Sequence, residues 1–260
     1  MTIAAEPLAP AVLALARAAG TAIMAIYDTA FEARTKADRS PVTDADEAAE
    51  ALIVAGLQRL APGIPVVAEE SVARHGPPQI GNGPFWLVDP LDGTREFVSR
   101  NGDFTVNIAL VGEDRRLLLG VVLAPACDSG VAWLGLPSGA RRFAGAADTD
   151  GVVIRARRMP PGGATVLVSR NHRDPETDGW LKTQTVAAEV TAGSSLKFCC
   201  IAEGQADLYP RFASIKEWDT AAGQAVLEAA GGAVVTWEGA PLTYGKPGFR
   251  NPGFLARGLA

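Results

Sequence analysis

Two aspartates stand three residues apart in the stretch FWLVDPLDGTREF, which covers residues 85–97. Four apolar residues lead into Asp89, as expected for a buried strand. Pro90 has no N–H for a strand ladder, so the strand is predicted to stop there. Asp92 would then follow in a turn close to Asp89. A pair of carboxylates at the end of a strand is suited to binding a cation.

The residues after the pair add a second chemical feature. Gly93 permits a tight backbone turn, and residues 94–97 can begin a short helix. The Leu91 carbonyl and the free amides of a helix start would then lie beside the carboxylates. Such a site would attract a hard cation and a phosphate group. An Asx-type turn with a helix cap explains the same string, so the string alone leaves both interpretations open.

Further carboxylates lie at the predicted ends of other elements. Glu69 and Glu70 end the apolar stretch VVAEES, where paired negative charge is costly without a cation. Asp219 lies in EWDTAAG at a predicted helix start, which is also consistent with a plain N-cap. Asp46 forms the string T-x-x-D with Thr43, which resembles a capping box. Each position has an ordinary explanation, but together they provide a set of oxygen ligands.

The residues that bind softer metals are few. The chain holds two histidines, His75 and His172, and three cysteines, Cys127, Cys199 and Cys200. They form neither a zinc spacing nor a disulfide framework, which favours a reducing compartment. We expect Cys199 and Cys200 to pack within a strand. An oxygen ligand set indicates Mg²⁺ or Mn²⁺ rather than zinc.

The elements that position these residues alternate between helices and strands. Helical periodicity is clear in the first helix, whose predicted core positions are Val12, Leu15, Ala19, Ile23 and Ile26. The run around it is interrupted by Arg17, so we expect neither a signal peptide nor a transmembrane segment. A second helix begins after Thr43, and the stretches DFTVNIALVG, RLLLGVVLAPA and SGVAWLGLP predict antiparallel strands.

The segment RARRMPPGGAT is the best candidate for a linker. We therefore predict two mixed α and β halves, residues 1–159 with most of the metal ligands and residues 160–260 with Asp219 and the substrate-binding residues. The fold class is α+β or α/β. A net charge of −5 argues against a nucleic-acid-binding protein, because that function needs a broad cationic face.

Several motifs together resemble one family. AEES, WLVDPLDGT and EWDTAAG match, in order and rough spacing, the metal motifs of the inositol-monophosphatase-like, lithium-sensitive phosphatases. GSSLKFCCIAEGQADLYPRF and NPGF are similar to the branch of CysQ-type 3'(2'),5'-bisphosphate nucleotidases. The resemblance extends from about Ser40 to Phe254. It implies the layered αβαβα sandwich of this phosphatase superfamily.

The resemblance also implies a ligand set. Glu69, Asp89 and the Leu91 carbonyl would hold one Mg²⁺, and Asp89, Asp92 and Asp219 a second. The family pattern implies about two or three Mg²⁺ ions per active site, with Mn²⁺ as a substitute and with Li⁺ and Ca²⁺ as inhibitors. These metal ligands, Glu69, Leu91, Asp92 and Asp219, would also line the substrate site.

Asp46 matches the aspartate that, with the motif threonine Thr94, orients and deprotonates the attacking water. Glu69 would share in catalysis, and Glu70 would lie outside the ligand shell. One departure from the family is Asp44, where relatives have a small residue. Its charge would raise the pKa of Asp46 slightly.

A second phosphate needs cations of its own. Arg170, His172 and Arg173 lie in SRNHRD, and solvated surface charge is the simpler interpretation of the two arginines. Lys197 interrupts the apolar run LKFCCIA, so a buried lysine with a partner is expected. The resemblance implies substrate contacts from Gly93, Thr94, His172, Ser194, Ser195, Lys197 and Arg211.

The implied activity is Mg²⁺-dependent removal of the 3'-phosphate from adenosine 3',5'-bisphosphate, with AMP as product, in sulfate assimilation. An inositol monophosphatase or broad sugar phosphatase is the alternative enzyme, and it predicts small neutral residues where Lys197 and Arg211 stand. A non-catalytic adaptor of the same fold is a third hypothesis, which a decayed site would favour. We expect a cytoplasmic monomer or homodimer with a small-molecule partner, and leave peripheral association with the inner membrane open.

Overall fold

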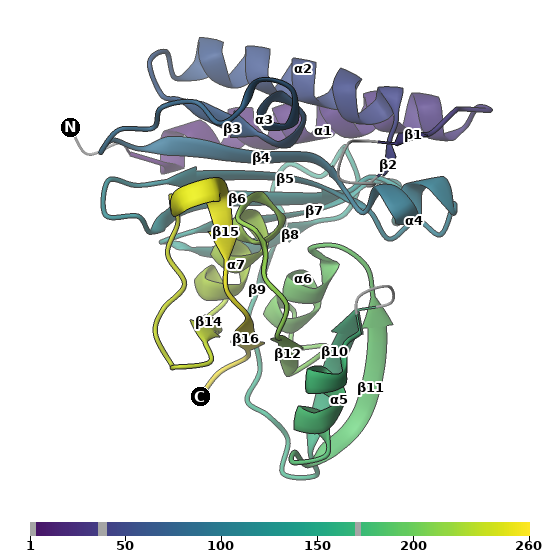
Figure 1. The fold of residues 1–260 in the computed structure, drawn as a ribbon, viewed down its shortest axis with the longest axis vertical. Helices are drawn as coiled ribbons and strands as arrows, with labels where there is room; N and C mark the ends of the chain where they lie inside the picture. Colours follow the sequence, from purple (N-terminus) through teal and green to yellow (C-terminus); the bar gives the residue numbers. More distant parts are fainter. Residues whose placement is uncertain (1–3, 36–40, 170–172) are drawn as a thin grey trace.

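Helices and sheets alternate in layers in this protein (Figure 1). Two long helices, α1 (Ala9–Tyr27) and α2 (Asp44–Leu60), cover one face of a seven-stranded sheet. Helix α7 (Trp218–Ala229) packs on the other face, and a five-stranded sheet follows beyond it. The computed structural model describes residues 4–35, 41–169 and 173–260.

The five-stranded sheet buries side chains on both of its faces. In strand β10 (Ala164–Ser169), Val166 and Val168 pack with Leu181 of helix α5 (Pro175–Leu181). Leu167, between them, packs into the large core that also contains α7. Alternate residues of a strand point to opposite faces, so this sheet separates α5 from α7. The order of layers is the predicted αβαβα sandwich.

The seven-stranded sheet is a meander in chain order, parallel between its first two strands and antiparallel elsewhere. The three predicted antiparallel strands are its β5, β6 and β7. Its strands are β3 (Val66–Ala68), β4 (Phe85–Asp92), β5 (Thr105–Val111), β6 (Leu117–Ala124), β7 (Val131–Leu136), β8 (Gly139–Phe143) and β9 (Val152–Ile154).

The second sheet has the order β11-β10-β12-β16-β14. Two short strand pairs, β1 with β2 and β13 with β15, lie outside both large sheets. The remaining strands are β1 (Arg34–Thr35), β2 (Pro41–Val42), β11 (Val186–Ala192), β12 (Leu208–Arg211), β13 (Ile215–Lys216), β14 (Ala233–Thr236), β15 (Arg250–Asn251) and β16 (Phe254–Arg257). The remaining helices are α3 (Glu69–His75), α4 (Thr94–Val98), α6 (Leu196–Ala202), and the 3₁₀ turns η1 (Glu6–Leu8) and η2 (Pro247–Phe249).

The first helix packs as a core helix, although its composition is also that of a membrane span. Together with η1 it is long and apolar enough to cross a bilayer, with a mean hydropathy of 1.7. The prediction that this run is too interrupted to span a membrane was therefore wrong as to length and composition. Val12, Ala19 and Ile23 are nonetheless fully buried in the core between helices α1 and α2 and the seven-stranded sheet. The predicted core positions Leu15 and Ile26 are half-buried. Burial of one face is typical of an amphipathic helix in a soluble domain.

Two sequence predictions were wrong about the kind of element. Glu69 and Glu70 open helix α3 instead of ending a strand, because strand β3 already stops at Ala68. The run LKFCCIA forms helix α6, so Cys199 and Cys200 pack on a helix and not in a strand. Cys199 is fully buried, and this burial raises the pKa of its thiol well above the ordinary value.

The predicted division at residues 159 and 160 falls in the segment between β9 and β10, where the chain passes from one sheet to the other. One core cluster contains residues of both sheets together with α6 and α7. The division into two halves stays a prediction.

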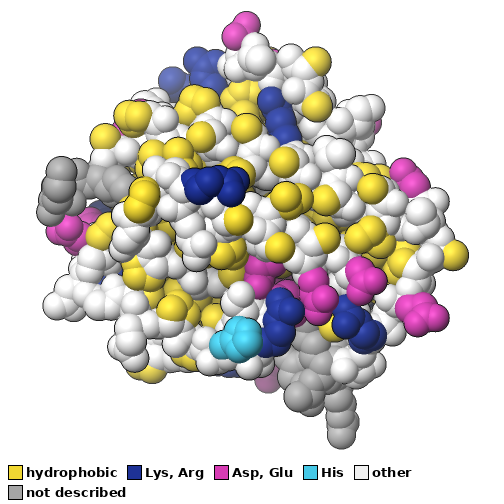
Figure 2. Space-filling view, turned by 90° about the horizontal axis from the view of Figure 1, so that it is seen from above, with side chains coloured by type: hydrophobic (Ala, Val, Ile, Leu, Met, Phe, Trp, Pro, Cys, Tyr) yellow, Lys and Arg dark blue, Asp and Glu magenta, His cyan; other side chains and the backbone are white. Residues whose placement is uncertain are grey.

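The outer face of α1 and α2 carries charges of both signs. Figure 2 shows this side of the molecule, with apolar side chains scattered over it, acidic side chains most frequent along one edge, and basic side chains both there and elsewhere on the face. Among the described residues that this view shows, cations do not form a broad face. This mixture of charges is consistent with the net charge of −5.

Candidate active site

Strand β4 carries two of the predicted ligands on an irregular segment. The strand continues through Pro90 to Asp92, so the prediction that it stops at the proline was wrong. Its pairing with β5 shifts between Asp89, opposite Asn107, and Asp92, opposite Thr105. Three steps on β4 therefore match two on β5, which is a β-bulge. A bulge accommodates a proline and breaks the strict alternation of faces, so both aspartates can serve one site.

Gly93 turns the chain sharply from this strand into helix α4. Its φ of +93° is in the left-handed region that favours glycine, and a Cβ there would lie 3.1 Å from the Asp103 carbonyl oxygen. The predicted short helix begins directly afterwards at Thr94. This turn places the first amides of α4 next to the carboxylates of β4.

Three carboxylates from distant parts of the sequence meet at this point. Glu69 is the first residue of α3, Asp89 lies on β4, and Asp219 is the second residue of α7. One oxygen atom from each lies within 4.8 Å of the others. The N-cap residue of α7 is Glu217 and not Asp219, so the plain N-cap interpretation of Asp219 was wrong. These three residues are a candidate metal centre.

The electrostatics of this group favour a cation. The pKa of Asp219 is raised well above its ordinary value, first by burial and then by the negative charges of Asp92 and Glu69. Arg211 acts in the opposite direction but does not compensate. An excess of negative charge in a desolvated site, formed by carboxylate oxygens, fits a hard divalent cation such as Mg²⁺.

Asp92 lies beside this group and is held by hydrogen bonds through one oxygen. Its Oδ2 accepts hydrogen bonds from Ser194 Oγ at 2.5 Å, from Ser195 Oγ at 3.3 Å and from Asn107 Nδ2 at 3.3 Å. The Thr105 hydroxyl in turn lies 2.5 Å from the Ser194 hydroxyl. These contacts fix the orientation of the carboxylate, whose negative charge is felt at Asp219.

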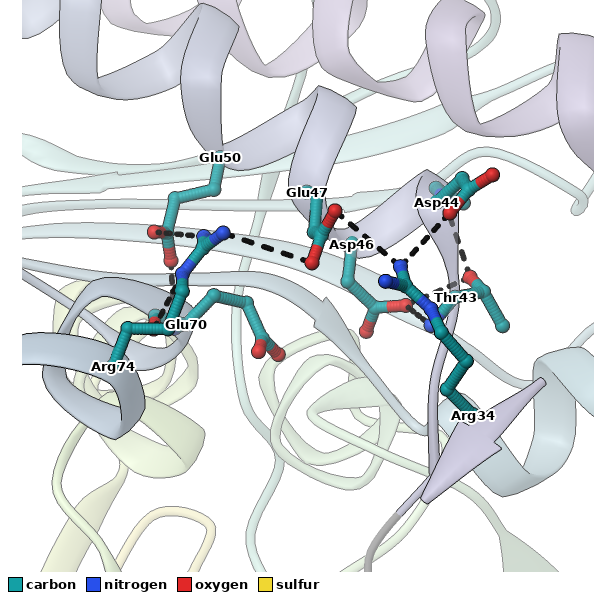
Figure 3. Close-up of polar contacts among 9 residues, drawn as sticks. Arg34, Thr43, Asp44, Asp46, Glu47, Glu50, Glu70 and Arg74 are labelled. Atoms are coloured by element: carbon teal, nitrogen blue, oxygen red, sulfur yellow. Dashed lines mark hydrogen bonds and ion pairs between the residues drawn. The ribbon is translucent and has the colours of Figure 1, made fainter. Parts of the chain in front are cut away.

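Asp46 contacts Thr43, as the capping-box pattern suggested, and also Thr94. Its Oδ2 accepts the Thr43 amide at 2.7 Å and the Thr43 hydroxyl at 2.8 Å, which completes the capping box of α2 (Figure 3). Its Oδ1 lies 3.2 Å from the Thr94 hydroxyl, which is also 3.3 Å from the Leu91 carbonyl oxygen. The cap therefore aims the second oxygen of Asp46 at Thr94.

The two neighbouring acids take different positions. Asp44 is exposed and forms an ion pair with Arg34 at 2.8 Å (Figure 3). Its predicted effect on the pKa of Asp46 stays a prediction. Glu70 is buried, and its amide donates to Glu50 on α2. Its place outside the ligand shell stays a prediction.

A pocket of about 230 Å³ opens beside the carboxylates. It is enclosed by the β4–α4 turn, by the segment before α6 and by the end of β12. Its lining includes Asp92, Gly93, Thr94, Ser194, Lys197, Arg211 and Asp219. The pocket thus places Ser194, Lys197 and Arg211 of the second half of the chain beside Asp92 of the first half, whereas Ser195 does not line it.

Lys197 is 4% exposed and has partners, as predicted for a lysine in an apolar run. Its Nζ donates to the carbonyl oxygens of Ser194 at 2.8 Å and Ala192 at 3.1 Å, and lies 5.1 Å from the centre of the Tyr209 ring. Carbonyl oxygens and an aromatic face stabilise the ammonium group without neutralising it. A buried positive charge is therefore available to an anionic ligand in the pocket.

The cations predicted in SRNHRD have a different outcome. Arg170 and His172 lie outside the described residues. Arg173 is exposed and pairs with Asp178 at 2.5 Å and Glu189 at 2.7 Å, which agrees with the surface interpretation.

Several residues of the site were not predicted from the sequence, among them Thr105, Asn107 and Glu96. Thr105 and Asn107 hold Ser194 and Asp92, and buried Glu96 of α4 lines the pocket. A signal existed for the first two, since they are polar residues two apart in the otherwise apolar strand TVNIALV, and such residues share one face.

Comparisons with known proteins agree with this geometry. The model of the inositol monophosphatase family matches residues 4–256. The chain is 45% identical to the 3'(2'),5'-bisphosphate nucleotidase CysQ of Shigella flexneri, over 92% of this chain and 95% of that protein. Among solved structures it is similar to CysQ of Bacteroides thetaiotaomicron, with a TM-score of 0.80, 34% identity and 98% of each chain covered.

An inositol monophosphatase from Anabaena is more distant in sequence, at 25% identity, but has the same fold. Its TM-score is 0.77, over 98% of this chain and 91% of that one. The match to the family model extends over nearly the whole chain and includes the carboxylate group and the pocket. The chain belongs to the inositol monophosphatase family.

Proposed function

We propose that this protein is a phosphoric monoester hydrolase, a 3'(2'),5'-bisphosphate nucleotidase that converts adenosine 3',5'-bisphosphate to AMP and phosphate in sulfur metabolism. The observation that carries the proposal is the placement of buried Lys197 and half-buried Arg211 in the same pocket as Asp92 and Asp219. A substrate with two phosphates needs one group to be cleaved and a second cationic site to hold the other. Curated relatives at 45% identity are named as this nucleotidase.

Glu69, Asp89, Asp92, Asp219 and the Leu91 carbonyl would hold Mg²⁺ in this enzyme. When bound, Mg²⁺ supplies positive charge that offsets the anionic phosphate and the developing charge of the leaving oxygen. The bulge in β4 and the helix starts of α3 and α7 position the carboxylates before any ion arrives.

Asp46 and Thr94 form the proton-accepting pair. The Thr94 hydroxyl can donate to Asp46 Oδ1. The lone pairs of the Thr94 hydroxyl oxygen then remain available to accept a hydrogen bond from water in the pocket. Asp46 Oδ2 is occupied by the cap of α2, so proton acceptance is assigned to Oδ1. Transfer through Thr94 to Asp46 would leave the water oxygen ready to attack phosphorus.

The residues that open α4 line the same pocket. The first amides of a helix have no intrahelical partner, so those after Gly93 can donate to phosphate oxygens. Lys197, Arg211 and the hydroxyls of Ser194 and Ser195 would then bind the second phosphate and the sugar.

An assay of phosphate release tests the proposal directly. Adenosine 3',5'-bisphosphate and inositol monophosphate are compared with and without Mg²⁺. Strong preference for the nucleotide in the presence of Mg²⁺ is expected. Equal or better hydrolysis of inositol monophosphate would indicate the broad phosphatase instead, and loss of all hydrolysis would indicate the adaptor.

The cellular setting is also part of the proposal. The described cysteines Cys127, Cys199 and Cys200 are free thiols, which suits the reducing cytoplasm. Peripheral attachment to the inner membrane, and the choice between a monomer and a homodimer, stay predictions.

A further inference from the structure

Glu50 is a buried acid that the reaction as proposed does not use. It lies on α2, one helical turn after Asp46, and is only 2% exposed. Residues four apart on a helix share a face, and Figure 3 shows both side chains extending from the same side of α2. A buried carboxylate is costly unless it has firm partners.

Its partners belong to the first turn of α3. Glu50 Oε2 accepts the Glu70 amide at 2.7 Å, and Oε1 accepts the Ser71 hydroxyl at 2.6 Å. Arg74, one turn further along α3, lies 3.7 Å from Oε1. Both oxygens of Glu50 are therefore used to hold one short helix.

Helix α3 lacks a cap of its own. Its N-cap residue is Ala68, which makes no side-chain cap bond, yet the amides of a first turn need acceptors. Glu50 accepts the amide of the second helical residue, which is the hydrogen bond that an N-cap serine or aspartate normally makes. Its negative charge also suits the positive end of the helix. A residue of α2 thus acts as the cap of α3.

The residue fixed by this cap is a candidate metal ligand. Glu69 is the first residue of α3, directly before the amide that Glu50 accepts. We infer that Glu50 is a positioning residue, which holds the first turn of α3 so that the Glu69 carboxylate meets Asp89 and Asp219. The inference rests on the metal role proposed for Glu69. Because Asp46 lies on the same helix face, α2 sets the distance between the proton acceptor and the metal centre.

The test measures Mg²⁺ binding without substrate, by calorimetry on metal-free protein. Glu50→Gln keeps the shape but replaces one acceptor oxygen by an amide donor, so Glu69 loses its fixed position. Loss of a residue that orients a ligand weakens metal binding about 10- to 100-fold. Glu50→Gln should show a weakening in this range, and a matching rise in the Mg²⁺ concentration for half-maximal activity, with kcat largely restored at saturating Mg²⁺.

The matched control is Glu47→Gln on the same helix. Glu47 also contacts Arg74, at 3.6 Å, but makes no bond to the first turn of α3 in the described structure. The Mg²⁺ affinity of Glu47→Gln should stay within about twofold of that of the wild type. If Glu50→Gln binds Mg²⁺ as tightly as wild type, or if Glu47→Gln weakens binding equally, the inference is overturned.

Two more variants keep the test decisive. If Glu50→Gln does not fold, Ser71→Ala removes only the hydroxyl bond to Oε1, and Mg²⁺ affinity should fall about threefold. An unchanged affinity in Ser71→Ala would then count against the inference. Glu69→Gln distinguishes the metal role of Glu69 from the positioning role of Glu50. If Glu69→Gln leaves Mg²⁺ binding intact, the proposed ligand set is wrong. If Glu69→Gln weakens Mg²⁺ binding and Glu50→Gln does not, only the positioning role is rejected.

Discussion

The hydroxyl of Ser194 donates to Oδ2 of Asp92 over 2.5 Å and joins the two sheets of this protein at the active site. Ser194 follows β11 of the five-stranded sheet, whereas Asp92 ends β4 of the seven-stranded sheet. Ser194 has a φ of +51°, in the left-handed region that only a few non-glycine residues adopt. The loop before α6 therefore contributes to the orientation of a predicted metal ligand as well as to the substrate pocket.

Asp92→Asn tests the charge at this contact. The change preserves shape but removes a negative charge, so we expect Mg²⁺ affinity and kcat to fall about 10- to 100-fold. Steady-state kinetics over a Mg²⁺ titration measure both. Ser194→Ala keeps the charge and should have a smaller effect. A kcat near that of wild type at saturating Mg²⁺ would show that Asp92 is not a ligand.

Thr94→Ala and Asp46→Asn should differ in stability although both impair catalysis. Loss of proton transfer lowers kcat about 10²- to 10⁴-fold in each variant. Asp46→Asn also disturbs the capping box with Thr43, so its free energy of unfolding should fall by about 0.5–2 kcal/mol. Urea unfolding compares the two. Equal stability losses would contradict the dual role of Asp46.

Lys197→Met tests the choice of substrate, because methionine keeps the buried stem of the side chain. A charge-assisted hydrogen bond contributes about 1.5–3 kcal/mol, which is roughly ten- to a hundredfold in affinity. The value of kcat/KM for adenosine 3',5'-bisphosphate should fall by about that factor, while hydrolysis of 3'-AMP, which has no 5'-phosphate, should hardly change. Exposed Lys182→Met is the control. Equal losses on both substrates would assign Lys197 to the core or to the metal site.

Li⁺ and Ca²⁺ should both inhibit. Li⁺ is small and hard but carries one charge, so at a Mg²⁺ position it offsets less of the charge on the leaving oxygen. Ca²⁺ accepts looser geometry and longer bonds at the same carboxylates. Titrations of each ion at fixed Mg²⁺ measure the effect, with Na⁺ and K⁺ as controls. Insensitivity to both Li⁺ and Ca²⁺ would argue against the metal mechanism.

Asp207 should make folding stability depend on pH. Burial raises its pKa, but hydrogen bonds from Arg157 and the Thr165 amide outweigh this, so the pKa of Asp207 is lowered in the folded protein. A lowered pKa stabilises the fold above the unfolded value of about 3.9, and this contribution disappears as pH falls through the lower folded value.

The measurement is the free energy of unfolding in urea between about pH 5 and pH 2, a range that begins above the unfolded pKa of about 3.9 and extends below it. Asp207→Asn should be less stable than wild type at pH 5, and the difference should narrow toward pH 2. Asp178→Asn removes an exposed ion pair with Arg173 and serves as the control, with little change expected at any pH. A difference for Asp207→Asn that stays constant with pH would contradict the linkage.

Local signals in the sequence determined much of this protein. The start of α2 and its capping box were predictable from Thr43 and from Asp46 three positions later, because a cap involves only residues within one helical turn. Gly93 predicted the sharp turn into α4, since the left-handed backbone conformation there is unfavourable for other residues. The carboxylates of the metal motifs and buried Lys197 were likewise recognisable from residue type and apolar neighbours.

Tertiary structure decided what depends on partners far away in the chain. Whether β4 ends at Pro90 depends on its register with β5, and the bulge there carries the strand on to Asp92. The run LKFCCIA is apolar enough for a strand or a helix, and packing against α7 selects the helix. Glu50 and α3 are 20 residues apart, so the sequence near α3 gave no sign of its cap. Residue type and spacing encode interactions within a turn, whereas the meeting of Glu69, Asp89 and Asp219 exists only once strand β4 and the starts of helices α3 and α7 have packed together.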